Sequence, residues 1–94
     1  MNQPEVHIQS YFSIDTDLAS GFSQWPEFVG GQDYNVILRA RDGTEVTIEL
    51  IQKDETEFVS IKSNNDSMLF QQALGLATYL LSKHSDNIII SRRS

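Results

Sequence analysis

The chain has 94 residues, close to the commonest size of one folded domain, and its 39% hydrophobic and 21% charged residues are typical of a folded protein. It contains no cysteine, which excludes a disulfide framework, a cysteine-ligated metal site and a thiol nucleophile. A net charge of -6 argues against binding to a nucleic-acid backbone or to an anionic membrane surface, because both need clustered basic side chains.

The start of the chain, Met1 to Glu5, lacks the basic residues and the apolar run of a signal peptide. The longest apolar runs have three residues, as in Ile88–Ile90, far fewer than a membrane span requires. No linker or internal repeat divides the sequence. We therefore expect a single domain over residues 1–94, located in the cytoplasm.

Taken in chain order, the first predicted element is a strand over Glu5 to Ile14. Its apolar residues alternate with polar ones, as in a strand with one buried face. The residues on the apolar face are Val6, Ile8, Phe12 and Ile14.

The alternation stops between Asp15 and Gln32, which we interpret as a long connection with at most one helical turn, capped by Asp15 or Asp17. This connection contains three aromatic residues, Phe22, Trp25 and Phe28. Two interpretations remain open. The aromatic rings cover an open end of the core, or they form a contact surface or the rim of a pocket.

Charge distribution bears on the second interpretation. Residues 1–38 hold no Lys or Arg, and all seven basic residues follow. Such a segment is either a solvated acidic surface or a face for a basic partner. Three carboxylates near the aromatic residues would favour a cationic partner, and they are Asp17, Glu27 and Asp33.

Three further strands are predicted at Tyr34–Arg41, Thr44–Gln52 and Glu57–Ser63, connected as a meander. A three-residue loop with Gly43 in the left-handed conformation puts the apolar residues of the first two strands on one face. It pairs Leu38 with Val46, Val36 with Ile48 and Tyr34 with Leu50. A two-residue turn at Asp54–Glu55 does the same for the second and third strands.

This register leaves Ile37, Ile51 and Phe58 on the opposite, mostly polar face. An apolar island on an open sheet face favours burial by a second copy of the chain. We therefore predict a homodimer formed through these three residues or through an unpaired strand edge.

A long helix is predicted from Asp66 to Ser85, with Asn65 or Asp66 as the N-cap and a broad apolar stripe centred on Ala73 and Ala77. Asn87 to Ser91 is the last predicted strand, running parallel to Glu57–Ser63. The predicted fold class is α+β, with an antiparallel sheet of about five strands in the order β-β-β-β-α-β and the long helix packed on one face.

The sequence shows no pattern typical of catalysis or of a cofactor site. Gly30-Gly31 is followed by Gln32-Asp33, without the lysine and helix start of a phosphate loop. A calcium loop starting at Asp15 would lack most of its ligands, and the two histidines, His7 and His84, lack metal-ligand spacing. We expect no enzymatic activity, cofactor or metal.

The leading hypothesis is a non-catalytic accessory or interaction protein that acts by protein contact, such as an inhibitor, an antitoxin-like protein or an adaptor. Its partner would be a basic protein, bound by the acidic N-terminal half and the aromatic segment. The alternative is a small-molecule binding domain with a pocket between the helix, the sheet and the Phe22–Phe28 segment.

Overall fold

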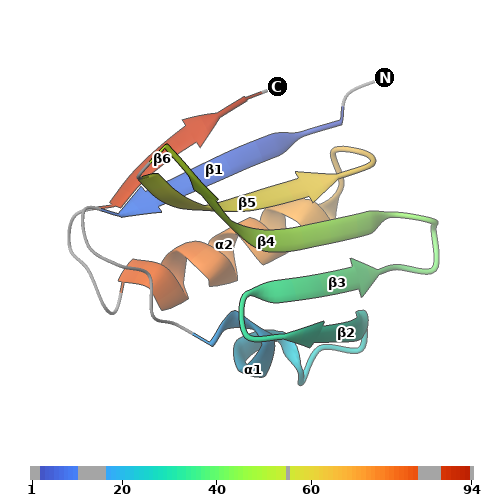
Figure 1. Cartoon of the computed structure of the whole chain (residues 1–94). Helices are drawn as coiled ribbons and strands as arrows, with labels where there is room; N and C mark the ends of the chain where they lie inside the picture. The colour runs from blue at the N-terminus through green and yellow to red at the C-terminus, as the bar shows by residue number, and fades with distance from the viewer. Residues whose placement is uncertain (1–2, 11–16, 55, 83–87, 94) are drawn as a thin grey trace.

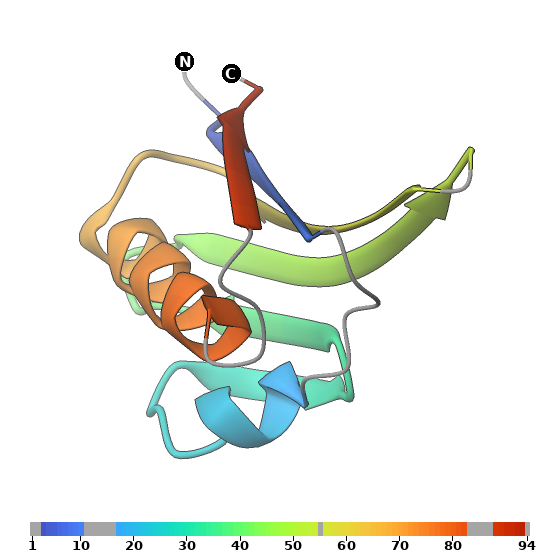
Figure 2. The same ribbon diagram turned by 90° about the vertical axis from the view of Figure 1, so that its left-hand side faces the viewer.

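The computed structural model describes residues 3–10, 17–54, 56–82 and 88–93, and these form one antiparallel sheet with both helices on the same face (Figures 1 and 2). The strand order is β2-β3-β4-β5-β1-β6. The elements are β1 (Glu5–Ser10), α1 (Leu18–Phe22), β2 (Phe28–Gln32), β3 (Asn35–Arg39), β4 (Glu45–Lys53), β5 (Thr56–Ser63), α2 (Met68–Ser82) and β6 (Ile88–Arg92). The predicted α+β class is confirmed, with six strands in place of about five.

The additional strand lies within residues 15–32, which we had interpreted as a connection. This segment contains the edge strand β2 in addition to α1, so the interpretation was wrong in giving it no strand. The predicted helical turn is present, and Asp17 is its N-cap. Strand β2 escaped sequence analysis because a bulge between Phe28 and Gly30 breaks its alternation.

The two predicted hairpins are confirmed. In the first, Leu38 pairs with Val46 and Val36 with Ile48, and Gly43 has a φ of 93°, which costs glycine little. The predicted third pair, Tyr34 with Leu50, is not formed in the ladder, because β3 begins one residue later, at Asn35. In the second hairpin Lys53 pairs with Thr56 across the two-residue turn. The apolar residues of β3, β4 and β5 that were predicted to face the core therefore share the face that the helices cover, whereas Ile37, Ile51 and Phe58 lie on the other face.

Helix α2 begins at Met68, two residues after the predicted start, and the segment after Ser82 lies outside the described residues until Ile88. The predicted cap was wrong, because the Ser67 hydroxyl accepts the Phe70 N–H at 3.4 Å. Asn65 instead accepts a hydrogen bond from the buried Thr44 hydroxyl at 3.1 Å, and Asp66 accepts one from the Gln71 amide.

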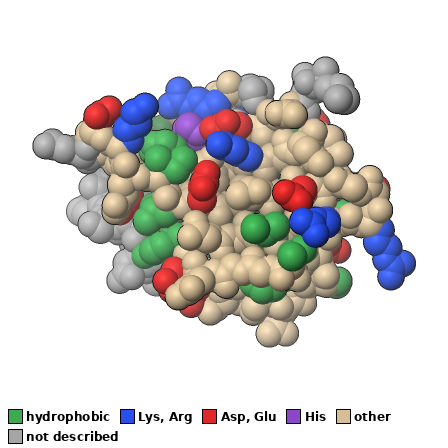
Figure 3. Space-filling model, turned by 45° about the vertical axis from the view of Figure 1, so that its right-hand side comes forward, with side chains coloured by type: hydrophobic (Ala, Val, Ile, Leu, Met, Phe, Trp, Pro, Cys, Tyr) green, Lys and Arg blue, Asp and Glu red, His purple; other side chains and the backbone are tan. Residues whose placement is uncertain are grey.

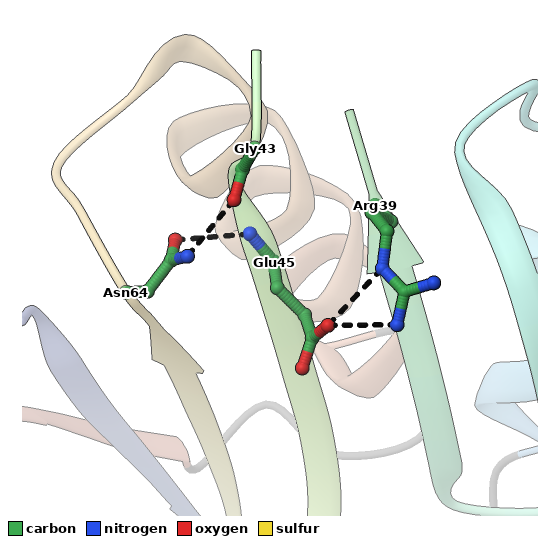
Figure 4. A network of polar contacts seen from close by, with 4 residues as sticks. All are labelled: Arg39, Gly43, Glu45 and Asn64. Carbon is green, nitrogen blue, oxygen red and sulfur yellow. Dashed lines mark hydrogen bonds and ion pairs between the residues drawn. The ribbon is translucent and has the colours of Figure 1, made fainter. Parts of the chain in front are cut away.

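Asn64, which follows β5, connects the end of that strand to the β3–β4 hairpin through its side chain (Figure 4). Its side-chain oxygen accepts the Glu45 N–H and its amide donates to the Gly43 carbonyl, each at 2.9 Å. Arg39 in turn binds the Glu45 carboxylate at 2.9 Å. Asn64 and Asn65, of which only Asn65 had been considered as a helix cap, therefore connect the end of β5 to the start of β4.

The first and last strands lie side by side, with β1 between β5 and β6. Since β1 is antiparallel to both neighbours, β6 runs parallel to β5, as predicted. The described strand β1 ends at Ser10, and the predicted continuation through Phe12 and Ile14 lies outside the described residues.

The core lies between the sheet and the two helices. Ala73 and Ala77 are fully buried, which lets α2 approach the strands closely, and Gly21 of α1 lies against Leu80, where a Cβ would come within 2.5 Å of that side chain. Among the described residues, the fully buried apolar ones are Val6, Ile8, Leu18, Phe22, Val36, Leu38, Val46, Ile48, Val59, Ile61, Phe70, Ala73 and Ala77.

Candidate functional site

Residues 17–33, which we call the acidic segment, fold around a shallow hollow of about 350 Å³ between the start of α1, strand β2 and the turn after β2. We call it the acidic hollow. Two of the predicted carboxylates line it, together with one of the predicted aromatic rings and several small polar side chains. Its lining includes Asp17, Ser20, Ser23, Phe28, Gln32 and Asp33.

Asp17 reaches the acidic hollow because it caps α1. Its carboxylate accepts the Ser20 N–H at 3.1 Å and the Ser20 hydroxyl at 2.7 Å. These hydrogen bonds lower the pKa of Asp17 below its ordinary value near 3.8, and the bond from the Ser20 hydroxyl has the largest effect. The exposed carboxylate is therefore negatively charged throughout the neutral pH range.

Asp33 reaches the same hollow from the turn between β2 and β3. Its φ of 58° lies in the left-handed region, which Asp tolerates better than most residues. Its carbonyl accepts the Ala19 N–H at 2.9 Å, and this bond holds the turn against α1. Two carboxylates separated by sixteen positions in the sequence thus open onto one hollow.

The aromatic residues divide between the core and the surface. Phe22 is 0% exposed, and its ring packs edge-on against Trp25 with a centroid distance of 4.9 Å. Trp25 and Phe28 are half-buried and pack against the core. A partner that reaches this segment can therefore contact Trp25 and Phe28, whereas the buried Phe22 ring is inaccessible to it.

Glu27 does not line the acidic hollow. It is half-buried before β2, and its carbonyl accepts the Arg39 N–H at 2.8 Å. Of the six residues predicted for partner contact, the structure brings together three, which are Asp17, Phe28 and Asp33.

The three residues predicted for self-association all lie on the uncovered face of the sheet, but they do not form one island. Ile51 pairs with Phe58, whereas Ile37 lies opposite Thr47. Thr47 and Ile51 are four positions apart on β4, which is about 13 Å along a strand. The register adds Ile89 of β6 instead, because Phe58 pairs with Gln9 and Gln9 with Ile89.

His7 covers part of this face, an arrangement that sequence analysis missed. Its ring stacks on Phe58 at a centroid distance of 4.4 Å. Arg93 donates from Nε to His7 Nδ1 at 3.2 Å, so the proton on Nε2 can be donated to Glu5. Figure 3 shows a histidine on the surface with basic and acidic side chains around it and a hydrophobic patch beside it.

Strand pairing alone brings these residues together. His7 and Arg93 are 86 positions apart in the sequence, and only the position of β1 between β5 and β6 makes them neighbours. The one signal available to sequence reasoning was that His7 lies on the same side of its predicted strand as Gln9, opposite the core residues.

Within the part of the chain that the structure describes, no group of three or more His, Cys, Asp or Glu residues could hold a metal ion. Among those same residues, neither helix has the length and hydropathy of a membrane span.

The fold and the hollow define an α+β protein with an open sheet face and an acidic surface site. Comparison of the chain with protein-family models, with curated proteins and with solved structures found no match.

Proposed function

We propose that this protein is a non-catalytic accessory or interaction module that binds a basic protein partner through the acidic hollow. A single observation carries the proposal: Asp17 and Asp33, from opposite ends of the acidic segment, open onto one hollow beside the Phe28 ring.

The chemistry of this hollow suits a lysine or arginine side chain. The two carboxylates would attract its charged group, and the half-buried Phe28 ring offers an apolar surface for its aliphatic stem. No Lys or Arg occurs in residues 1–38, so the chain carries no cation close in sequence that would compete for these carboxylates. Electrostatic attraction of this kind accelerates association and weakens as salt is added.

The test is a two-dimensional NMR titration of the labelled protein with a lysine-rich peptide and with a glutamate-rich peptide of equal length. We expect the lysine-rich peptide to shift amide signals of residues 17–23 and 31–33, and we expect added salt to reduce the effect. The double substitution Asp17→Asn and Asp33→Asn should weaken binding about tenfold while keeping the fold, because Asn is also a good N-cap and tolerates a positive φ.

A matched control removes the same charge elsewhere, with Asp54→Asn and Asp66→Asn, two exposed carboxylates away from the hollow. This variant should bind nearly as well as the native chain. Equal weakening in both double variants, or shifts spread evenly over the surface, would refute a specific role for the acidic hollow.

A further inference from the structure

Strand β6 forms one edge of the sheet, and its outer side offers a surface for strand addition. The opposite edge, β2, is bulged and contains two glycines, features that discourage pairing with another chain. Strand β6 has neither a bulge in its pairing with β1 nor a proline. In the described part of the chain no strand lies beyond it.

The hydrogen-bond pattern shows which backbone groups face outward. Arg93 N–H donates to the Glu5 carbonyl at 2.9 Å, so Arg93 and Glu5 are a hydrogen-bonded pair. Because such pairs alternate along an antiparallel ladder, Ser91 and Ile89 also direct their backbone groups toward β1. The N–H and C=O groups of Ile88, Ile90 and Arg92 therefore point away from β1, toward the open edge.

The side chains of this edge are apolar on both faces of the sheet. Ile89 lies on the uncovered face and is 42% exposed, while Ile90 lies on the helix face and is 50% exposed. The run Ile88-Ile89-Ile90 is symmetric about its middle residue. An antiparallel copy centred on Ile89 would pair Ile89 with Ile89 and Ile88 with Ile90, and every pair would have both side chains on the same face.

The same register satisfies the backbone. Ile88 and Ile90 both direct their backbone groups outward, so a pair formed between them exchanges two hydrogen bonds. The central Ile89 pair is then a non-hydrogen-bonded pair, in which the side chains approach most closely.

Charge also favours a second copy of this chain as the occupant. Residues 88–93 carry two arginines and no carboxylate, so the remainder of the chain, from a total of -6, carries -8. In the antiparallel pairing the two Arg92 residues lie six positions apart, about 20 Å, well beyond the screening length in physiological salt. The basic ends of the two β6 strands are therefore far enough apart not to repel each other.

We propose that two copies of this chain pair through β6, antiparallel and with Ile89 at the two-fold axis. The contact is independent of the acidic hollow, which lies at β2, the other edge of the sheet. Its area is small, so a reversible dimer that forms at high protein concentration is expected.

Analytical ultracentrifugation across a range of concentrations tests the proposal. The native chain should show a reversible monomer–dimer equilibrium. Ile90→Pro removes an N–H that points away from β1, so the monomer keeps its internal pairing and the dimer loses two hydrogen bonds. The dissociation constant of the dimer should rise about tenfold or more. Ile37→Lys, on the uncovered face, should leave the equilibrium unchanged.

A disulfide test fixes the register and does not depend on how well the proline variant folds. The chain has no cysteine, so Ile89→Cys introduces a single thiol. At the centre of a non-hydrogen-bonded pair the two Cα atoms lie about 4.5 Å apart, within the range of a disulfide. Mild oxidation should give a covalent dimer for Ile89→Cys and monomer for Ile37→Cys and Ser91→Cys.

Three results would overturn the proposal. They are a native chain that stays monomeric at every concentration, a dimer that Ile37→Lys dissociates and Ile90→Pro does not, and a disulfide formed by Ser91→Cys but not by Ile89→Cys. Loss of peptide binding in the acidic hollow would affect none of these measurements.

Discussion

Ser60 and Ser63 lie three positions apart on β5, and both are buried, yet their hydroxyl groups have different surroundings. The Ser63 hydroxyl accepts the Asn65 N–H at 3.3 Å, just before α2. The Ser60 hydroxyl, on the uncovered face between Glu49 and His7, has no hydrogen-bond partner among the described residues. Burying a hydroxyl without a partner is unfavourable, so only Ser63 is expected to stabilise the fold through its side chain.

Replacing each serine by alanine tests this difference. Ser60→Ala should leave the free energy of unfolding unchanged or raise it by up to about 1 kcal/mol, because it removes an unsatisfied polar group. Ser63→Ala should lower it by about 1 kcal/mol, because the Asn65 N–H loses its acceptor. Urea unfolding monitored by circular dichroism measures both. A clear loss of stability in Ser60→Ala would show that its hydroxyl is satisfied in solution.

At the scale of the element, α2 shows how side-chain size sets the distance between helix and sheet. Ala73 and Ala77 are fully buried, while Gly75 is exposed and has open space where a Cβ would stand. The apolar stripe predicted from the sequence is the buried face, apart from Leu74, Leu76 and Leu80, which are half-buried at its margins.

Two substitutions in α2 should therefore have opposite effects. Gly75→Ala should raise the free energy of unfolding by about 1 kcal/mol, because alanine favours the helix and meets no neighbour. Ala77→Leu should lower it by about 1–3 kcal/mol, because the larger side chain forces the helix from the sheet. Thermal unfolding of the two variants beside the native chain measures the difference. Equal stability of Ala77→Leu and the native chain would contradict close packing of α2.

At the scale of the whole molecule, the acidic segment has two roles, one in the core and one at the surface. Its buried residues complete the core beside α2, since Leu18 and Phe22 are fully buried. Its exposed carboxylates, Asp17 and Asp33, form the proposed binding surface. The two interpretations of the aromatic segment that the sequence left open are thus compatible, because Phe22 faces inward and Phe28 borders the hollow.

Substitutions of Phe22 and Trp25 should distinguish the inner aromatic residue of this segment from the outer one. Phe22→Ala should lower the free energy of unfolding by about 3–5 kcal/mol, because it leaves a cavity in the core. Trp25→Ala should cost less, about 1–2 kcal/mol, because the indole is half-buried. Urea unfolding measures both values. A larger loss for Trp25→Ala than for Phe22→Ala would contradict this assignment of inner and outer residues.

Much of the fold was predictable because its signals are local. The alternation of apolar residues and the turn at Gly43 determined the pairing of Val36 with Ile48 and of Leu38 with Val46. The helical spacing around Ala73 and Ala77 determined the buried face of α2. Strand β2 was not predictable in this way, since its bulge and its two glycines remove the alternation.

The sequence by itself therefore determined the fold class, the register of the central hairpins and the acidic character of the first half, because each depends on residues close together in the chain. Only the tertiary structure decided which distant residues meet. It placed Asp17 and Asp33 at one hollow beside α1 and β2. It also brought His7 into contact with Phe58 and Arg93, and it placed β6 at an edge of the sheet. These outcomes depend on strand order, which the burial of one shared apolar core selects and no local pattern encodes.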